Sequence, residues 1–316
     1  MKFYISRYTN IEERTFDLEV VTPLFLSGAD QRVAELRTAS IKGMLRFWWR
    51  ALYGSDDVIG MKKEENRVFG STASKSTIKI RIIHKEEPKQ YVGADLPAGI
   101  PFCVHGKSTG IIHYLFGQAY SKRNFIPPLT KFELSIQFHS EDQIKVTNTV
   151  KTFFKYGCLG SRSRNGFGSL HCHFIEHEKR DKISNEPLAF TAFSNKSTLF
   201  LFKEHNNWVG ALSEIGNAYR GARLSPELEK PHHFEMRSRI ALPIISRDRT
   251  ETEGWMRSQR QTKSYFLKVI KTPNDKFRGQ ILFLPYEHTN PLYKKAYSIM
   301  NEQITRTASP EVIHAI

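Results

Sequence analysis

Alternating apolar and polar side chains predict four strands in the first half of the chain. Ile78, Ile80 and Ile82 alternate with Lys79 and Arg81, which is typical of a strand with one buried face and basic residues pointing outward. The predicted strands span residues 14–26, 77–84, 131–139 and 170–176. The first of them is only partly alternating and leaves its sheet near the Thr22-Pro23 step.

A helical period predicts two helices between these strands. The first spans residues 40–54, with Ser40 as its N-cap. At about 100° per residue, its core face carries Ile41, Met44, Leu45, Trp48, Ala51 and Leu52. Its other face carries Lys42, Arg46, Trp49, Arg50 and Tyr53. The second helix spans residues 144–156, and its core side is formed by Val146, Val150, Phe153 and Phe154.

The order strand, helix, strand, strand, helix, strand predicts an α+β domain of the ferredoxin-like type. Residues 85–129 interrupt it as an insertion without a clear period. A polar stretch at 176–186 indicates a domain boundary. We therefore expect an N-terminal domain over residues 1–180 and a C-terminal domain over residues 181–316.

The second half predicts a degenerate copy of the same fold. Expected strands span residues 198–202, 239–245, 265–270 and 280–285, and expected helices span 207–219 and 291–306. The order of these elements does not match the first half cleanly.

The net positive charge of the chain then indicates what kind of partner it binds. The 316 residues include 47 Lys and Arg against 32 Asp and Glu, a formal charge of +15, so the protein should associate with a polyanion, nucleic acid first. Without an 18-residue apolar run or the apolar core of a signal peptide, the sequence predicts a cytoplasmic protein that does not bind membranes. Three scattered cysteines, Cys103, Cys158 and Cys172, predict neither a disulfide framework nor a metal site, and we expect no cofactor.

The basic face of the first helix is the first candidate RNA-binding site. Lys42, Arg46 and Arg50 surround Trp49, and no acidic residue lies between Lys42 and Arg50 to pair with them. Cations beside an aromatic ring suit a nucleic-acid strand, whose phosphates attract charge and whose bases stack. The alternative is an ordinary solvated helix face.

The glycine-rich loop at residues 157–169 is the second candidate. Arg162 and Arg164 supply charge for phosphate, and Gly160, Gly166 and Gly168 let backbone N–H groups approach an anion. The loop lacks the Gly-Lys-Ser/Thr end of a P-loop and leads into a strand, so nucleotide hydrolysis is not indicated. The alternative is a helix cap followed by a tight turn.

These motifs together resemble the RAMP superfamily of CRISPR systems. The resemblance rests on TPLFLSGA at 22–29, ELR at 35–37, SIKG at 40–43, LRFWWR at 45–50, FGS at 69–71 and RSRNGFGS at 162–169. Within this superfamily the motifs look like those of the first subunit, the cap RAMP protein, of the Cmr, or type III-B, effector complex. The resemblance covers roughly residues 15–176 and is weaker beyond them.

The resemblance implies two ferredoxin-like, RRM-like domains in a ribonucleoprotein for antiviral defence. Implied partners are CRISPR RNA, near the 3′ end of the guide, target RNA, and adjacent cap and backbone Cmr subunits of the RAMP type. Implied RNA contacts are Lys42, Arg46, Trp49, Arg50, Gly160, Arg162, Arg164, Gly166 and Gly168. On this basis we expect a noncatalytic RNA-binding subunit.

The alternative function is an endoribonuclease that uses Asp30. In related backbone RAMP subunits an acidic residue of this loop cleaves target RNA, whereas Asp in a Gly-Ala-Asp turn is commonly a turn former. His171, His173, His232 and His233 could also suggest RNA processing, but the sequence pairs none of them with a second base.

Overall fold

The first sheet has the strand order of a ferredoxin-like fold. In the computed structural model, which describes residues 10–30, 32–84, 89–104, 107–117, 120–173, 184–228, 234–242, 244, 252–261 and 263–312, four strands pair in the order β2-β7-β1-β8. They are β1 (Ile11–Val20), β2 (Lys79–His84), β7 (Lys131–His139) and β8 (Leu170–Cys172), and every pairing is antiparallel. The predicted fold of this half is thereby confirmed.

Two helices cover one face of this sheet. They are α1 (Thr38–Tyr53) and α4 (Gln143–Tyr156). Along β1, Leu18 is buried beneath them, whereas Glu13, Thr15 and Asp17 are exposed on the opposite face. Because one face of the sheet is covered and the other is open to solvent, apolar and polar residues alternate along these strands, and the sequence shows this pattern.

Several boundaries differ from the sequence-based expectation. Strand β1 starts at Ile11 and ends at Val20, because the chain turns away before Pro23. Helix α1 starts at Thr38 with Arg37 at its N-cap position, so Ser40 lies inside the helix and is not its cap. A further helix, α2 (Val58–Phe69), follows α1 and was not expected.

The insertion at residues 85–129 contains structure of its own. Its described parts form β3 (Tyr91–Val92), β4 (Pro101–Val104), β5 (Lys107–Gly110), α3 (Ile111–Phe116) and β6 (Asn124–Phe125). Ile111, Ile112, Leu115 and Phe116 of α3 are buried in the core of the second half of the chain. The insertion therefore ties the first half to the second.

The second sheet repeats the order of the first. Its strands pair in the order β10-β11-β9-β12, all antiparallel. They are β9 (Thr198–His205), β10 (Tyr265–Lys271), β11 (Phe277–Phe283) and β12 (Ser309–Val312), and the helices α5 (Trp208–Leu224) and α8 (Leu292–Thr305) occupy the positions of α1 and α4. Because β12 completes the motif, the element order matches the first half more closely than the sequence indicated.

One expected strand of the second half is absent from the described residues. Of the range 239–245, residues 239–242 and 244 are described and contain a turn and a single bridge between Leu242 and Gln261. Two short helices, α6 (Glu235–Ser238) and α7 (Gly254–Ser258), stand on either side of this segment. The predicted boundary at residues 180 and 181 lies outside the described residues, as do His232 and His233.

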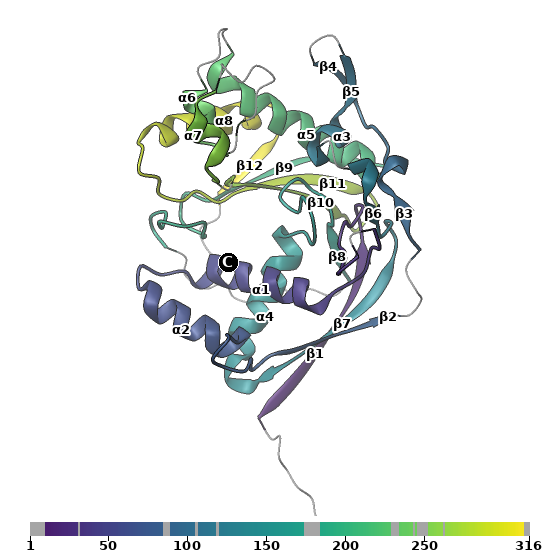
Figure 1. Ribbon diagram of the computed structural model, residues 1–316, viewed down its shortest axis with the longest axis vertical. Helices are drawn as coiled ribbons and strands as arrows, with labels where there is room; N and C mark the ends of the chain where they lie inside the picture. The colour runs from purple at the N-terminus through teal and green to yellow at the C-terminus, as the bar shows by residue number, and fades with distance from the viewer. Residues whose placement is uncertain are drawn as a thin grey trace, which may run out of the picture.

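The two halves stack in layers (Figure 1): the first sheet, then α1 and α4, then the second sheet, then α5 and α8. Along β10, Phe266 joins the core around α1, whereas Leu267 joins the core around α5. The second sheet is thus buried on both faces, which explains its nearly continuous apolar strands.

Candidate nucleic-acid interface

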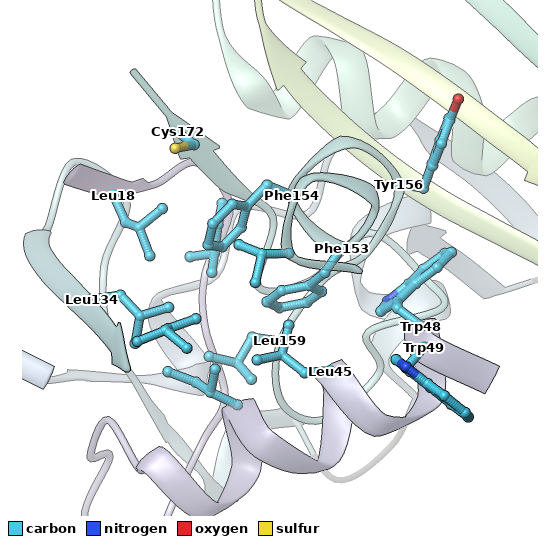
Figure 2. Packing of buried hydrophobic residues seen from close by; sticks show 14 of the residues in the cluster. Leu18, Leu45, Trp48, Trp49, Leu134, Phe153, Phe154, Tyr156, Leu159 and Cys172 are labelled. Atoms are coloured by element: carbon cyan, nitrogen blue, oxygen red, sulfur yellow. The ribbon is translucent and has the colours of Figure 1, made fainter. Parts of the chain in front are cut away.

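Trp49 lies in the core, so the expectation that it faces outward is wrong. Its side chain is 1% exposed, with its ring centroid 5.7 Å from that of Tyr53 and 6.4 Å from that of Phe69 at the end of α2. Figure 2 shows Trp48 and Trp49 together in the buried cluster. Trp48, expected as a core anchor, is 0% exposed. The unexpected α2 is what covers Trp49.

The cations of α1 are also engaged by α2. Glu65, 3% exposed, accepts hydrogen bonds from Arg46 Nε at 2.7 Å and from Arg50 Nη1 at 3.0 Å. Arg46 further donates to Asn66 and to the Gly70 carbonyl. The α1 sequence has no acidic residue to pair with these cations, and α2 supplies one in Glu65. The hydrogen bonds of Arg46 therefore hold α1 against α2. Lys42 is partly buried, and burial lowers its pKa.

The glycines of the 157–169 loop serve close packing. Gly160, Gly166 and Gly168 all have positive φ. A Cβ on Gly168 would lie 1.9 Å from the Leu159 carbonyl oxygen, and one on Gly160 would lie 2.5 Å from that of Phe25. The Gly168 N–H donates to the Pro23 carbonyl, so it is not available for an anion.

Arg164 joins the loop to both halves of the chain. Its guanidinium carbon lies 4.4 Å from the ring centroid of Phe266 and 5.2 Å from that of Phe47, and its Nη1 donates to the Lys263 carbonyl at 2.6 Å. Burial lowers the pKa of Arg164 to about 10, which leaves it charged at neutral pH.

Two adjoining hollows open on either side of Arg164. The first, about 600 Å³ and here called the helix hollow, lies beside the end of α1 and is lined by Phe47, Arg50, Arg164, Arg239, Trp255, Arg260, Tyr286 and His288, among others. The second, about 550 Å³ and here called the loop hollow, is lined by Tyr114, Arg162, Arg164, Asn165, Tyr219, Arg223 and Lys263, among others. Both are also lined by Leu242 and Gln261. Together they form what we call the basic groove.

The basic groove carries a strong excess of positive charge. Seven of its described lining residues are Arg or Lys, and none is Asp or Glu; a hollow beside α8, by contrast, is lined by Glu186 and Glu287. Within the described residues, Arg162, Arg223, Arg239, Arg260 and Lys263 take part in no ion pair. The buried Nε of Arg239 has no hydrogen-bond partner among them.

Aromatic rings interrupt this charge. Trp255, Tyr286 and Phe47 line the helix hollow, and Tyr114 and Tyr219 line the loop hollow. Unpaired cations beside aromatic faces are the arrangement that binds single-stranded nucleic acid, through phosphate contacts and base stacking.

The structure brings together part of the expected site. Arg50, Arg162 and Arg164 line the basic groove, whereas Lys42, Arg46 and Trp49 do not. Sequence reasoning missed Arg223, Arg239, Arg260 and Lys263. One signal was available, because residues 254–274 contain no Asp or Glu but include Arg257, Arg260, Lys263, Lys268 and Lys271.

Asp30 has the geometry of a turn former. Its Oδ1 accepts the Arg32 backbone N–H at 2.8 Å and lies 3.5 Å from Arg32 Nε. This N–H lowers the pKa of Asp30, and the carboxylate does not line the described groove.

The remaining titratable candidates lie elsewhere. His171 and His173 lie side by side, with ring centroids 4.7 Å apart, and His173 Nε2 is 3.9 Å from Glu19. Cys158 and Cys172 are buried and Cys103 is exposed. In the described part of the chain, His, Cys, Asp and Glu form no group of three able to hold a metal ion, and no helix there is long and apolar enough to span a membrane.

Comparison with known proteins shows consistent similarities in sequence. Residues 17–171 match the model of the RAMP superfamily. The CRISPR system Cmr subunit Cmr1-2 of Pyrococcus furiosus is 31% identical over 181 residues, which cover 52% of this chain and 96% of the relative. Subunit Cmr1-1 of the same organism is 33% identical over 168 residues, which cover 51% of this chain and 47% of the relative.

Solved structures share the fold. The apo crystal structure of Cmr1 from Pyrococcus furiosus superposes with a TM-score of 0.64 at 21% identity, covering 95% of this chain and 98% of that one. A chain of a type III-B Cmr-beta complex bound to cognate target RNA superposes with a TM-score of 0.55 at 12% identity, covering 94% and 100%.

Proposed function

Because this chain belongs to the Cmr1 subunits of the RAMP superfamily, we propose that it binds single-stranded RNA along the basic groove within a type III-B CRISPR effector complex. The observation that carries this proposal is the groove itself, with seven cations, interleaved aromatic rings and no acidic residue among its described lining. Such a surface attracts phosphate without selecting sequence.

The RNA ligands that fit the proposal are CRISPR RNA, near the 3′ end of the guide, and the target RNA paired with it. Its relatives are subunits of Cmr complexes, so other RAMP subunits of the complex are the expected protein partners. The subunit acts by holding RNA and does not cleave it, which agrees with the turn geometry of Asp30.

Filter binding of single-stranded RNA across a salt series tests the proposal. Four to six phosphate contacts predict a log–log slope of roughly −3 to −4 for a single strand. A slope near zero would contradict a phosphate-lined groove.

A matched pair of variants locates the binding surface. Arg260→Gln removes an exposed cation of the helix hollow and should make the slope shallower by about 0.7. Arg306→Gln removes an exposed cation at the C-cap of α8 that pairs with Glu302 outside the groove and should leave the slope unchanged. Equal effects of the two changes would show that binding is not centred on the groove.

Cleavage is tested separately with labelled RNA and Mg²⁺. We expect intact RNA with both the wild type and Asp30→Ala. Fragments that vanish in Asp30→Ala would establish the ribonuclease alternative.

A further inference from the structure

Lys263 is held in the loop hollow without a counter-charge. Its Nζ donates to the neutral Asn165 Oδ1 at 2.5 Å and lies 4.1 Å from the ring centroid of Tyr219. No described carboxylate lines this hollow. A charged ammonium here loses hydration and gains no ion pair, which is costly.

The groups that face Lys263 add to this cost. The glycine-rich loop contributes Arg162 and Arg164, and α5 contributes Arg223, whose Nη1 donates to the Tyr114 hydroxyl. The Cys158 thiol also acts on Lys263, and Arg223 and Glu227 both act on Arg237. The pKa of Lys263 lies well below its ordinary value, because of burial first and then of Arg164, Arg223 and Arg162.

An anion in the loop hollow would reverse both penalties at once. It would supply the missing counter-charge for Lys263 and would screen the repulsion from Arg162 and Arg223. The forked guanidinium groups fit the tetrahedral oxygens of a phosphate.

We propose that the loop hollow seats one RNA phosphate against Arg162, Arg223 and Lys263, and that Lys263 takes up a proton from solvent as this phosphate enters. The inference rests on the proposed RNA-binding function and adds to it a proton-coupled site. The proton adds to the Nζ lone pair, and no bond of the RNA is broken.

Burial shifts the pKa of four other groups beside the groove, and it leaves each of them outside the range between about pH 7 and pH 8.5. The ordinary pKa of a histidine already lies below this range, and burial lowers that of His288 further. Burial lowers the pKa of Arg164 to about 10 and raises that of Tyr219 to about 12, so both stay above the range. Cys158 is also shifted upward, again by burial. Proton uptake in this range would therefore report on Lys263.

Calorimetry of the full chain tests the proposal. The probe is an oligoadenylate of about 12 nucleotides, within the size range of single-strand sites, titrated in two buffers of different protonation enthalpy. We expect up to one proton taken up per bound RNA, and an affinity that falls about three- to tenfold as pH rises from about 7 to 8.5.

Two variants assign the proton. Lys263→Arg keeps a permanent charge and should bind RNA without buffer-dependent heat or pH-dependent affinity. Lys263→Met should bind more weakly, also without proton uptake. Wild-type uptake retained in Lys263→Arg would overturn the assignment, and so would binding by the wild type without any uptake.

Two further arms separate the sources of failure. Sulfate, a tetrahedral anion that does not titrate in this range, replaces RNA as the probe. Proton-coupled binding of sulfate together with uncoupled binding of RNA would overturn the RNA phosphate as the occupant. Absence of RNA binding in any buffer would overturn the proposed function itself.

Discussion

At the scale of single residues, one helix sends neighbouring side chains to different tasks. Trp48 and Trp49 are both buried, whereas Arg50 reaches the basic groove. Phe47 contributes to both the core and the groove, because its ring centroid lies 5.7 Å from that of Phe266 and its side chain also lines the helix hollow. Substitutions in α1 therefore separate stability from RNA affinity.

Replacing Trp49 by Ala should destabilise the protein and leave RNA contacts in place. Loss of a buried tryptophan costs about 3–5 kcal/mol in the free energy of unfolding, and Trp49 does not line the groove. Urea denaturation measures the cost, and RNA binding at low temperature measures affinity. If the Trp49→Ala variant kept wild-type stability but lost much of its RNA affinity, Trp49 would be an RNA-binding residue and not a core residue.

The sequence could predict the apolar side of α1 but could not identify the partner of its polar side. Ile41, Leu45 and Trp48 are buried as expected. The position of Trp49 depends on α2, whose buried residues are Glu65, Val68 and Phe69. With a carboxylate inside its packing face, α2 has no clear apolar stripe, so neither the helix nor its cover was visible in the pattern.

At the scale of elements, a network of charges fixes α2 against α4. Arg67 of α2 pairs with Glu64 at 2.9 Å and with the buried Asp142 just before α4. Lys145 of α4 pairs with Glu64 at 3.1 Å. These partners lower the pKa of Glu64 to about 2, and the hydrogen bond from Arg67 is the largest cause.

This pKa predicts a loss of stability in acid. A carboxylate with a lowered folded-state pKa stabilises the fold above its unfolded pKa of 4.5, and this contribution is lost as pH falls toward about 2. Because a third of the side chain is exposed, we expect about 1–2 kcal/mol. Urea unfolding at several pH values should show that the free energy of unfolding of the wild type exceeds that of Glu64→Gln near neutral pH and that this difference shrinks in acid. A difference that does not change with pH would contradict the prediction.

The short elements of the second half explain the rest of what sequence could not supply. Strand β12 has four residues, including a proline and a glutamate, so its sequence does not read as a strand. The cations of the groove come from separate places, namely α5 for Arg223, the end of α6 for Arg239, and the segment before β10 for Arg260 and Lys263. Only the fold gathers them.

At the scale of the whole molecule, the second sheet is shared between two cores. Leu199, Phe266, Leu282 and Leu284 pack into the cluster around α1 and α4. Lys268, 0% exposed, donates to the carbonyls of Gly157 at 2.6 Å and Leu170 at 3.1 Å. The interface between the halves therefore resembles the interior of one domain.

Such an interface predicts a single unfolding transition. Midpoints from far-ultraviolet circular dichroism and from tryptophan fluorescence should coincide in urea. Lys268→Met leaves two buried carbonyls without their donor and should lower the shared midpoint, since each unsatisfied group costs about 1–3 kcal/mol. Two separate midpoints in the wild type would show that the halves unfold independently.

The distribution of the tryptophans gives the protein its own spectroscopic reporters. Of the four tryptophans, Trp48 and Trp49 are sealed in the core, and Trp255 is partly exposed on the wall of the helix hollow. Trp208 is partly buried against the core around α5 and does not line the groove, so its emission should not respond to RNA. The emission of the α1 pair should follow the integrity of the fold. A nucleobase stacked on Trp255 should quench the redder emission of that indole alone, so folding and occupancy can be followed in one unlabelled sample.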